Sequence, residues 1–270
     1  MQVTDTAGGL SIELSDYGDC LGSMTMAVKL KKIAALTAGG MLALSLISPA
    51  YAGYEEAVDY MNRGEFELAI EELKPLVMLG FPPALYQQGV LYENGFGVNR
   101  DLERAFKLYE RAAGRSVPEA QFALAQMYAD GKGVDKDARK AFIYTKRAAE
   151  KDLPAAQFNL GVMFQHGSGT TQSYHNAAMW YEQAAKRNYA LAQFNLALLY
   201  FDGLGVTKDL EMSYVWNRVA AFNGYKPAEK SMELDSQKLS RDQIKRARER
   251  ADQLYLEISP KKEELFNPYQ

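Results

Sequence analysis

Few side chains in this sequence could act as a nucleophile, a general base or a metal ligand, and their spacing does not assemble a catalytic centre. The two histidines, His166 and His175, are nine residues apart, which suits no pair of zinc ligands on one helix or loop. His166 stands where the related segments carry asparagine or aspartate, which favours a polar residue at a helix end. Neither a G-x-S-x-G motif nor a phosphate-binding loop is present. We expect no enzymatic activity, no metal site and no cofactor.

Residues 26–52 have the order of a secretory signal peptide. Three lysines precede an apolar run over 33–47, and Ala50-Tyr51-Ala52 follows with the small-residue pattern of a cleavage site. The run contains two glycines and is shorter than the roughly 20 residues that span a bilayer. We expect cleavage after Ala52 and a periplasmic or secreted product without stable membrane insertion.

The residues ahead of this segment do not fit a signal peptide, which normally begins at the start of the chain. Residues 1–25 contain four acidic side chains. We interpret them as a non-native or untranslated extension, with Met24 or Met26 as the true start of translation. The single cysteine, Cys20, would then be absent from the mature protein, which excludes a disulfide and a thiolate metal site there.

The composition is that of a folded chain with a charge close to neutral. Hydrophobic residues make up 47% of the sequence, well above the level of disordered chains. Lys and Arg total 31 against 34 Asp and Glu, so no strong field would attract nucleic acid. One basic stretch is interleaved with acidic residues, as on a solvated helix face: Arg241, Lys245, Arg246, Arg248 and Arg250. We expect no nucleic-acid partner.

A repeat of 36 residues organises most of the remaining chain. Alanines recur in register at Ala84, Ala120, Ala156, Ala192 and Ala228. Glycine pairs in a G-x-G pattern follow at the same period: Gly95 and Gly97, Gly131 and Gly133, Gly167 and Gly169, Gly203 and Gly205. A fixed period of this length predicts one supersecondary unit stacked several times.

Each unit is predicted to begin with a helix that packs closely on a partner. In the last three units, leucine and an aromatic residue four positions apart share one face of this helix, and a small residue lies between them; Gln88 replaces the leucine in the first unit. The small residues, which let the partner helix approach, are Gly89, Ala125, Gly161 and Ala197. The G-x-G pair then ends the helix, because glycine readily adopts the left-handed conformation.

A second helix is predicted to follow each glycine pair. Aspartate is expected to cap its amino terminus at Asp101, Asp137 and Asp209, and Ser173 replaces aspartate in the third unit. The predicted buried stripe contains an alanine, then Leu108, Tyr144, Trp180 or Trp216, then an alanine pair.

These residues resemble the Sel-1-like repeat, a longer relative of the tetratricopeptide repeat, over residues 84–227. The third unit shows the pattern best, with Leu160-Gly161 in its first helix and Trp180-Tyr181 in its second. The resemblance implies an all-α fold, an α-solenoid in which helical hairpins stack into a right-handed superhelix.

The repeat period also divides the chain. Residues 53–83 resemble an atypical tetratricopeptide-like first repeat, residues 228–259 are expected to form capping helices, and 260–270 a mobile tail. Within the cap, Ser240-x-x-Gln243 predicts a capping box. The four Sel-1-like repeats are expected at 84–119, 120–155, 156–191 and 192–227.

The resemblance implies that the first helices line a concave face, where solenoids bind extended or helical partners. Its predicted lining includes Tyr86, Phe122, Phe158, Phe194, Gln126 and Gln165, although the aromatic residues are equally compatible with burial between units. Asn159 and Asn195 lie one repeat apart and would hold a peptide backbone, as asparagines of tetratricopeptide proteins do. The alternative is that they satisfy polar groups between neighbouring repeats.

We therefore predict a non-catalytic scaffold of the cell envelope, or a secreted one, that binds a protein or peptide. A peptidoglycan- or glycan-associated envelope factor is the alternative, since exported members of this family act in the envelope. Cysteine-rich relatives have been associated with β-lactam hydrolysis. Here the formal S-x-x-K match, Ser259 to Lys262, straddles Pro260, and we interpret it as accidental.

Overall fold

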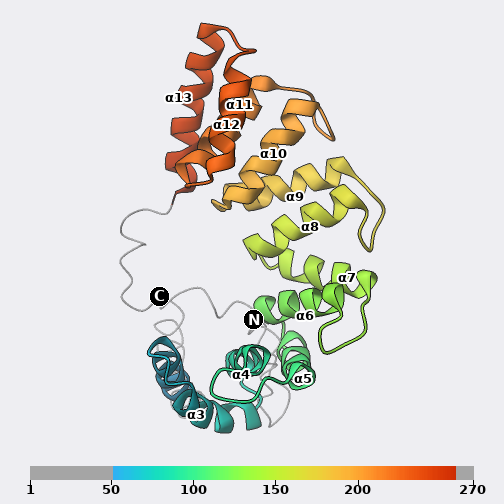
Figure 1. The fold of residues 1–270 in the computed structure, drawn as a ribbon, viewed down its shortest axis with the longest axis vertical. Coiled ribbons are helices and arrows are strands. Elements are labelled where there is room, and N and C mark those ends of the chain that lie inside the picture. Colours follow the sequence, from blue (N-terminus) through green and yellow to red (C-terminus); the bar gives the residue numbers. More distant parts are fainter. Residues whose placement is uncertain (1–50, 260–270) are drawn as a thin grey trace, which may run out of the picture. The chain divides into compact units, whose positions relative to one another are not determined.

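The computed structural model describes residues 51–259, where the regular secondary structure is α-helical. This range divides into two compact units on either side of the bond between Lys136 and Asp137 (Figure 1). The first unit has a helix over 51–62, then α3 (Phe66–Met78), α4 (Pro82–Asn94), α5 (Leu102–Ala113) and α6 (Pro118–Asp130). The second has α7 (Ala138–Ala149), α8 (Pro154–His166), α9 (Tyr174–Lys186), α10 (Ala190–Asp202), α11 (Leu210–Phe222), α12 (Lys226–Ser236) and α13 (Arg241–Ile258).

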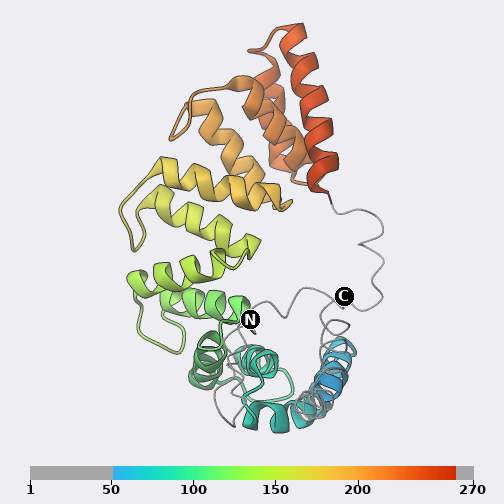
Figure 2. The same ribbon diagram turned by 180° about the vertical axis from the view of Figure 1, so that it is seen from behind.

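The predicted all-α solenoid fold is confirmed. In the first unit, α4 lies between α3 and α5 in both views (Figures 1 and 2). In the second, α8 packs on α7 and α9, and α10 packs on α9 and α11. The predicted extension (1–25), nearly all of the predicted signal peptide (26–52) and the predicted tail (260–270) lie outside the described residues.

The alanines that define the repeat lie in the packed interior between helices. Each of them is completely buried: Ala84, Ala120, Ala156, Ala192 and Ala228. Alanine suits these positions because a larger side chain would keep neighbouring helices apart. The repeat period is thus the spacing of equivalent helix contacts.

The predicted carboxyl-terminal ends of the first helices and the predicted amino-terminal caps of the second helices are confirmed. The first helices end at the first glycine of each pair, with φ between 71° and 75° at Gly95, Gly131, Gly167 and Gly203. The second helices begin at the predicted caps. The Asp101 carboxylate accepts from the Arg104 N–H at 2.9 Å, and the Ser173 hydroxyl accepts from the Asn176 N–H at 3.2 Å. Asp137 and Asp209 accept in the same way.

In two hairpins, a glycine of the first helix lies directly against a tyrosine ring of the second helix. A Cβ atom on Gly89 would lie 2.5 Å from the Tyr109 ring, and one on Gly161 would lie 2.6 Å from the Tyr181 ring. The predicted close approach is therefore confirmed in these two hairpins, and a buried tyrosine fills the space that the missing side chain leaves.

The predicted buried stripe of the second helix was partly wrong. Leu108 and Trp216 are buried, whereas Tyr144 and Trp180 are only half-buried. The next residues along two of these helices, Tyr109 and Tyr181, are 1% and 0% exposed. In the third repeat, Gly161 opposite Tyr181 explains why Tyr181 is buried in place of Trp180, because the glycine leaves room for a ring at that position.

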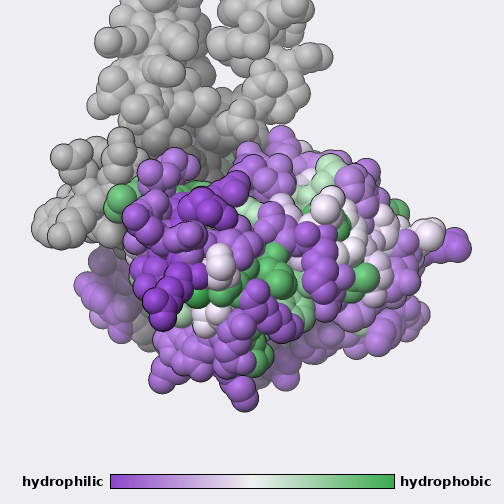
Figure 3. Space-filling model, turned by 90° about the horizontal axis from the view of Figure 1, so that it is seen from above, coloured by the Kyte–Doolittle hydropathy of each residue, from purple (hydrophilic) through white to green (hydrophobic). Residues whose placement is uncertain are grey.

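The last two helices cover the end of the second unit. The predicted capping box is present: the Ser240 N–H donates to Gln243 Oε1 at 2.9 Å, and the Gln243 N–H donates to Ser240 Oγ at 3.3 Å. Ala247 and Ala251 of α13 are buried against the core. Figure 3 views the molecule from the end that carries α13, and hydrophilic side chains cover most of it. A polar outer face is what a terminal cap of a solenoid requires.

A buried polar network joins α11 to α12. Asp235 is 1% exposed, and its Oδ2 accepts from Ser213 Oγ at 3.0 Å and from Asn217 Nδ2 at 2.9 Å. Burial raises the pKa of Asp235, although these hydrogen bonds and the Lys238 charge oppose the shift. Ser213 departs from the alanine found at this repeat position, and the network gives that departure a structural reason.

Candidate partner-binding face

The predicted lining residues lie at equivalent positions on the first helices. Tyr86 is on α4, Phe122 on α6, Phe158 on α8 and Phe194 on α10, and all four side chains are half-buried. Because they recur at the repeat period, each occupies the same place in its own hairpin. Their role in binding stays a prediction.

Ring contacts hold three of these aromatic side chains. The Tyr86 ring centroid is 5.7 Å from that of Tyr109. Phe158 lies 5.7 Å from Tyr181 and 5.4 Å from Tyr189, and Phe194 lies 5.1 Å from Tyr225. Each of these rings therefore packs against a neighbouring ring and still keeps part of its surface accessible. This arrangement is intermediate between the two predicted ones, an accessible lining and complete burial between repeats.

The two predicted asparagines are in different states. Asn195 Nδ2 donates to the Leu191 carbonyl of its own helix at 2.8 Å. The side-chain amide of Asn159 is half-buried and forms no hydrogen bond with any described residue. Neither amide bonds to a neighbouring repeat within residues 51–259, so the alternative role in joining repeats has no contact to support it there.

The two predicted glutamines also differ. Gln126 is exposed on α6. Gln165 is half-buried on α8, and its Oε1 accepts a hydrogen bond from the Tyr181 hydroxyl at 2.7 Å. In the first unit, Glu93 occupies the equivalent position and accepts from the Tyr109 hydroxyl, also at 2.7 Å. The side-chain oxygen of Gln165 is therefore already bonded within its own hairpin, whereas its amide nitrogen is not.

The sequence interpretation overlooked a different row of amides that joins successive hairpins. Gln121, Gln157 and Gln193 are 6%, 1% and 0% exposed. Their Nε2 atoms donate to the carbonyls of Ala113, Ala149 and Ala185, near the ends of the preceding helices. The signal was the glutamine after three of the repeat alanines, because a polar residue recurring next to a fully buried one indicates a structural hydrogen bond.

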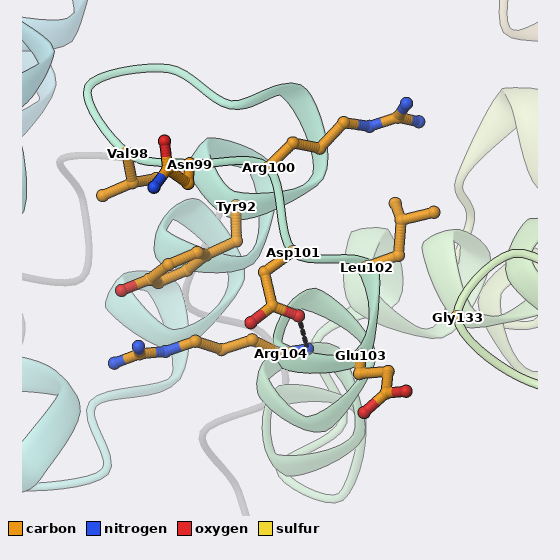
Figure 4. Close-up of a pocket in the computed structure, with 9 residues that line it drawn as sticks. All are labelled: Tyr92, Val98, Asn99, Arg100, Asp101, Leu102, Glu103, Arg104 and Gly133. Carbon is orange, nitrogen blue, oxygen red and sulfur yellow. Dashed lines mark hydrogen bonds between the residues drawn. The ribbon is translucent and has the colours of Figure 1, made fainter.

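A surface pocket of about 750 Å³ lies in the first unit beside the loop from α4 to α5 (Figure 4). Three of its four charged side chains have structural partners: Asp101 caps α5, Arg100 Nε donates to the Glu93 carbonyl at 2.8 Å, and the Arg104 guanidinium lies 4.3 Å from the Tyr92 ring centroid. None of the lining residues is a serine, cysteine, lysine or histidine.

The side chains first considered for chemistry do not line this pocket. His166 is the exposed last residue of α8, and His175 is exposed with its Nδ1 3.4 Å from the Gly205 carbonyl oxygen. Ser259 follows α13, and Lys262 lies outside the described residues. Within residues 51–259, no three His, Cys, Asp or Glu side chains are grouped so that they could hold a metal ion.

Comparison with known families assigns this arrangement of hairpins. The Sel1 repeat model matches residues 82–116, 118–153, 154–189 and 190–221, just over half of the chain. The chain belongs to the Sel1 repeat family. Each matched segment begins at the first residue of α4, α6, α8 or α10. Sel1 repeats generally mediate protein interactions. In the part of the chain that the structure describes, no helix of this Sel1 repeat protein has the length and hydropathy to cross a bilayer.

Two solved structures extend the similarity beyond single repeats. A protective antigen of uropathogenic Escherichia coli, described as having an SLR fold, is 29% identical with a TM-score of 0.66, over 71% of this chain and 42% of the antigen. A Sel1 repeat protein from Oxalobacter formigenes is 31% identical with a TM-score of 0.63, over 66% of this chain and 73% of that protein. This Sel1 repeat protein thus spans less than half the length of the antigen. Among curated proteins, none matches the chain significantly.

Proposed function

We propose that this Sel1 repeat protein is a non-catalytic scaffold that binds a partner protein or peptide along the first helices of its repeats. Membership of the family supports protein interaction in general. The particular face is supported by the half-buried aromatic side chains that recur on these helices, Phe158 and Phe194 in the second unit. Partly accessible rings held in place by their neighbours provide apolar contact area at a low cost in conformational entropy.

The observation that carries the proposal is the free amide of Asn159. A side-chain amide offers two donors and one acceptor, and a peptide backbone can satisfy both kinds of group at once. Asn159 is half-buried beside Phe158 with no hydrogen-bond partner among the described residues, so a bound backbone would replace scarce water contacts.

We expect Asn159→Ala to weaken partner binding by about 1 kcal/mol, or roughly fivefold, with little change in the free energy of unfolding. Stability should hold because the substitution removes no hydrogen bond to a described residue. The partner would be captured from the envelope fraction with the wild-type protein as bait, and its dissociation constant would be measured for each variant.

Asn176→Ala is the matched control for this experiment. Asn176 is a half-buried asparagine of α9, the second helix of the same hairpin. Its replacement by alanine should leave the affinity for the partner unchanged. Unchanged affinity for Asn159→Ala together with lower stability would instead indicate that Asn159 has only a structural role.

The proposal includes export to the periplasm or the medium after cleavage behind Ala52. It is supported by the order of lysines, apolar run and small residues in 26–52. The intact mass of the purified protein should correspond to a chain that begins at Gly53. A mass that includes the residues before Gly53 would contradict export by this route.

A glycan-associated role is the second candidate, and the aromatic pairs favour it. Phe158 and Tyr189 are two half-buried rings with centroids 5.4 Å apart, and Phe194 and Tyr225 are two more with centroids 5.1 Å apart. Aromatic rings present apolar faces of the kind that pack on sugar rings. Sedimentation of the protein with purified peptidoglycan, without a captured protein partner, would favour this role over the scaffold.

A further inference from the structure

α12 continues the row of first helices in the second unit, although the family match ends before it, at residue 221. α12 begins at Lys226, 36 residues after the first residue of α10, and its repeat alanine, Ala228, is completely buried. The residues of the two helices can therefore be compared position by position. Phe194, Leu198 and Phe201 of α10 correspond to Lys230, Leu234 and Gln237.

Side-chain contacts join α10 to α12 at both ends. The Phe194 ring centroid is 5.1 Å from that of Tyr225, the residue before α12. At the other end, Lys238 Nζ, two residues after α12, is 4.0 Å from the Phe201 ring centroid. These two contacts bracket the middle of each helix.

Between these contacts, each helix presents an exposed leucine. Leu198 is 37% exposed and Leu234 is 48% exposed, although both are large apolar side chains. They occupy equivalent repeat positions, and Leu198 shares a helix face with Phe194 and Phe201, four residues before it and three after it. The two leucines thus offer apolar contact area in the part of the chain where α10 and α12 meet.

The charge beside these leucines is positive. Lys230 lies four residues before Leu234 and Lys238 lies four residues after it, which places one lysine about a turn away on each side. Both lysines are exposed, and neither forms an ion pair with a carboxylate in residues 51–259. Asp235 does not pair with them, because it is buried and accepts hydrogen bonds from α11.

A third ammonium group approaches the same aromatic ring. Lys208 Nζ is 5.7 Å from the Phe201 centroid, to which Lys238 Nζ is also close. In two earlier repeats this position holds Arg100 and Gln172, whose side chains donate to a backbone carbonyl of the preceding helix. Lys208 makes no such bond with a described residue. Like charges held around one ring repel each other, and a bound anion would offset this repulsion.

We propose that Leu198, Leu234, Lys230 and Lys238 form a docking surface for a partner segment in which a large apolar side chain lies close to a carboxylate. The apolar side chain would contact the leucines, and the carboxylate would accept charge-assisted hydrogen bonds from a lysine. The surface rests on the proposed function, because it names the kind of segment that binds along the first helices.

The spacing on α12 sets the spacing that the partner needs. Four residues of a helix correspond to about 6 Å, the separation between Leu234 and either lysine along the helix axis. Residues two apart on one side of an extended segment are separated by roughly the same distance, as are residues three to four apart in a helix.

The test uses a random dodecapeptide library selected on the purified protein. Selected peptides should carry an acidic residue two, three or four positions from a large apolar residue. Replacing aspartate by asparagine, or glutamate by glutamine, removes the charge and keeps the shape, and it should weaken binding about tenfold in a fluorescence polarisation assay. In the Lys230→Gln/Lys238→Gln variant, the acidic and neutral peptides should bind within about twofold of each other.

Three further variants locate the surface. Arg241→Gln/Lys245→Gln is the matched control, since it removes two exposed cations of α13 and should keep the preference for the acidic peptide. Leu234→Ser should weaken the binding of both peptides about fivefold, because it removes apolar contact area. Lys230→Gln alone covers the case in which the double variant does not fold, because Lys230 bonds to no described side chain, and it should lower the preference about threefold.

The outcomes separate this surface from the function on which it rests. Equal binding of the acidic and neutral peptides to the wild-type protein, a preference that survives in both lysine variants, or unchanged binding to Leu234→Ser would overturn the docking surface and leave the scaffold proposal standing. Failure of every peptide to bind would overturn both.

Discussion

Gly205→Ala is expected to lower the free energy of unfolding by about 2–5 kcal/mol, among the largest effects of any single methyl group in this protein. Gly205 is the second glycine of its pair, with φ of 72°. A Cβ atom there would overlap the backbone of Tyr174 and His175, in the first turn of the preceding second helix. The methyl group thus adds a steric clash between hairpins to the strain of a left-handed residue.

Gly224→Ala is the control that separates these two effects. Gly224 has a φ of 79°, and a Cβ atom there would meet nothing within 4 Å. The equivalent left-handed positions of earlier repeats hold Ser116, Asp152 and Asn188, so the backbone accepts a side chain at this place. We expect a loss of only about 1–2 kcal/mol in urea unfolding. Equal losses for the two variants would show that the second glycine is not needed for contact between hairpins.

Gly161→Ala and Tyr181→Thr are each expected to destabilise the protein, by about 1–3 and 3–5 kcal/mol respectively. The added methyl group would lie 2.6 Å from a ring that is fully buried and fixed by its hydrogen bond to Gln165. Removing the ring leaves a cavity against the glycine and frees Gln165 from its hydrogen-bond donor.

The double variant tests whether the two residues form one packing unit. The sequence itself carries Ala125 and Thr145 at the equivalent positions of the preceding repeat. We therefore expect Gly161→Ala/Tyr181→Thr to be less destabilised than the sum of the single variants by about 1–2 kcal/mol, measured by urea unfolding of all three proteins. Strictly additive losses would contradict this pairing of small and large residues.

The fold could be predicted because its signals are local and repeat. Glycine in the left-handed conformation, a short polar cap and a buried alanine each act through neighbouring backbone or one facing helix, so their spacing alone identified Gly95, Asp101 and Ala84. Repetition then separated these signals from chance, since the same residue types returned at a constant interval.

Interactions that depend on a pair of residues were harder to predict. The burial of Tyr181 in place of Trp180 follows from the glycine opposite it, and the hydrogen bond of Gln157 follows from a carbonyl in the preceding helix. Asp235 is buried only because Ser213 and Asn217 face it from another helix. Which side chain is buried, and which groups form hydrogen bonds, can be predicted only when the relative positions of the helices are known.

The candidate binding face was predictable in position but not in detail. Periodicity placed Phe158 and Asn159 on a first helix, whereas the degree of burial and the free amide of Asn159 depend on the packing around them.

Photo-crosslinking to a captured partner would show whether the partner binds along the first helices. Benzoylphenylalanine would replace Leu198 of α10 in one variant and Met179 of α9 in the other, two exposed apolar residues of the second unit that are 37% and 52% accessible. We expect partner crosslinks from position 198 and none from position 179. Crosslinks from position 179 alone, or equal yields from both, would contradict it.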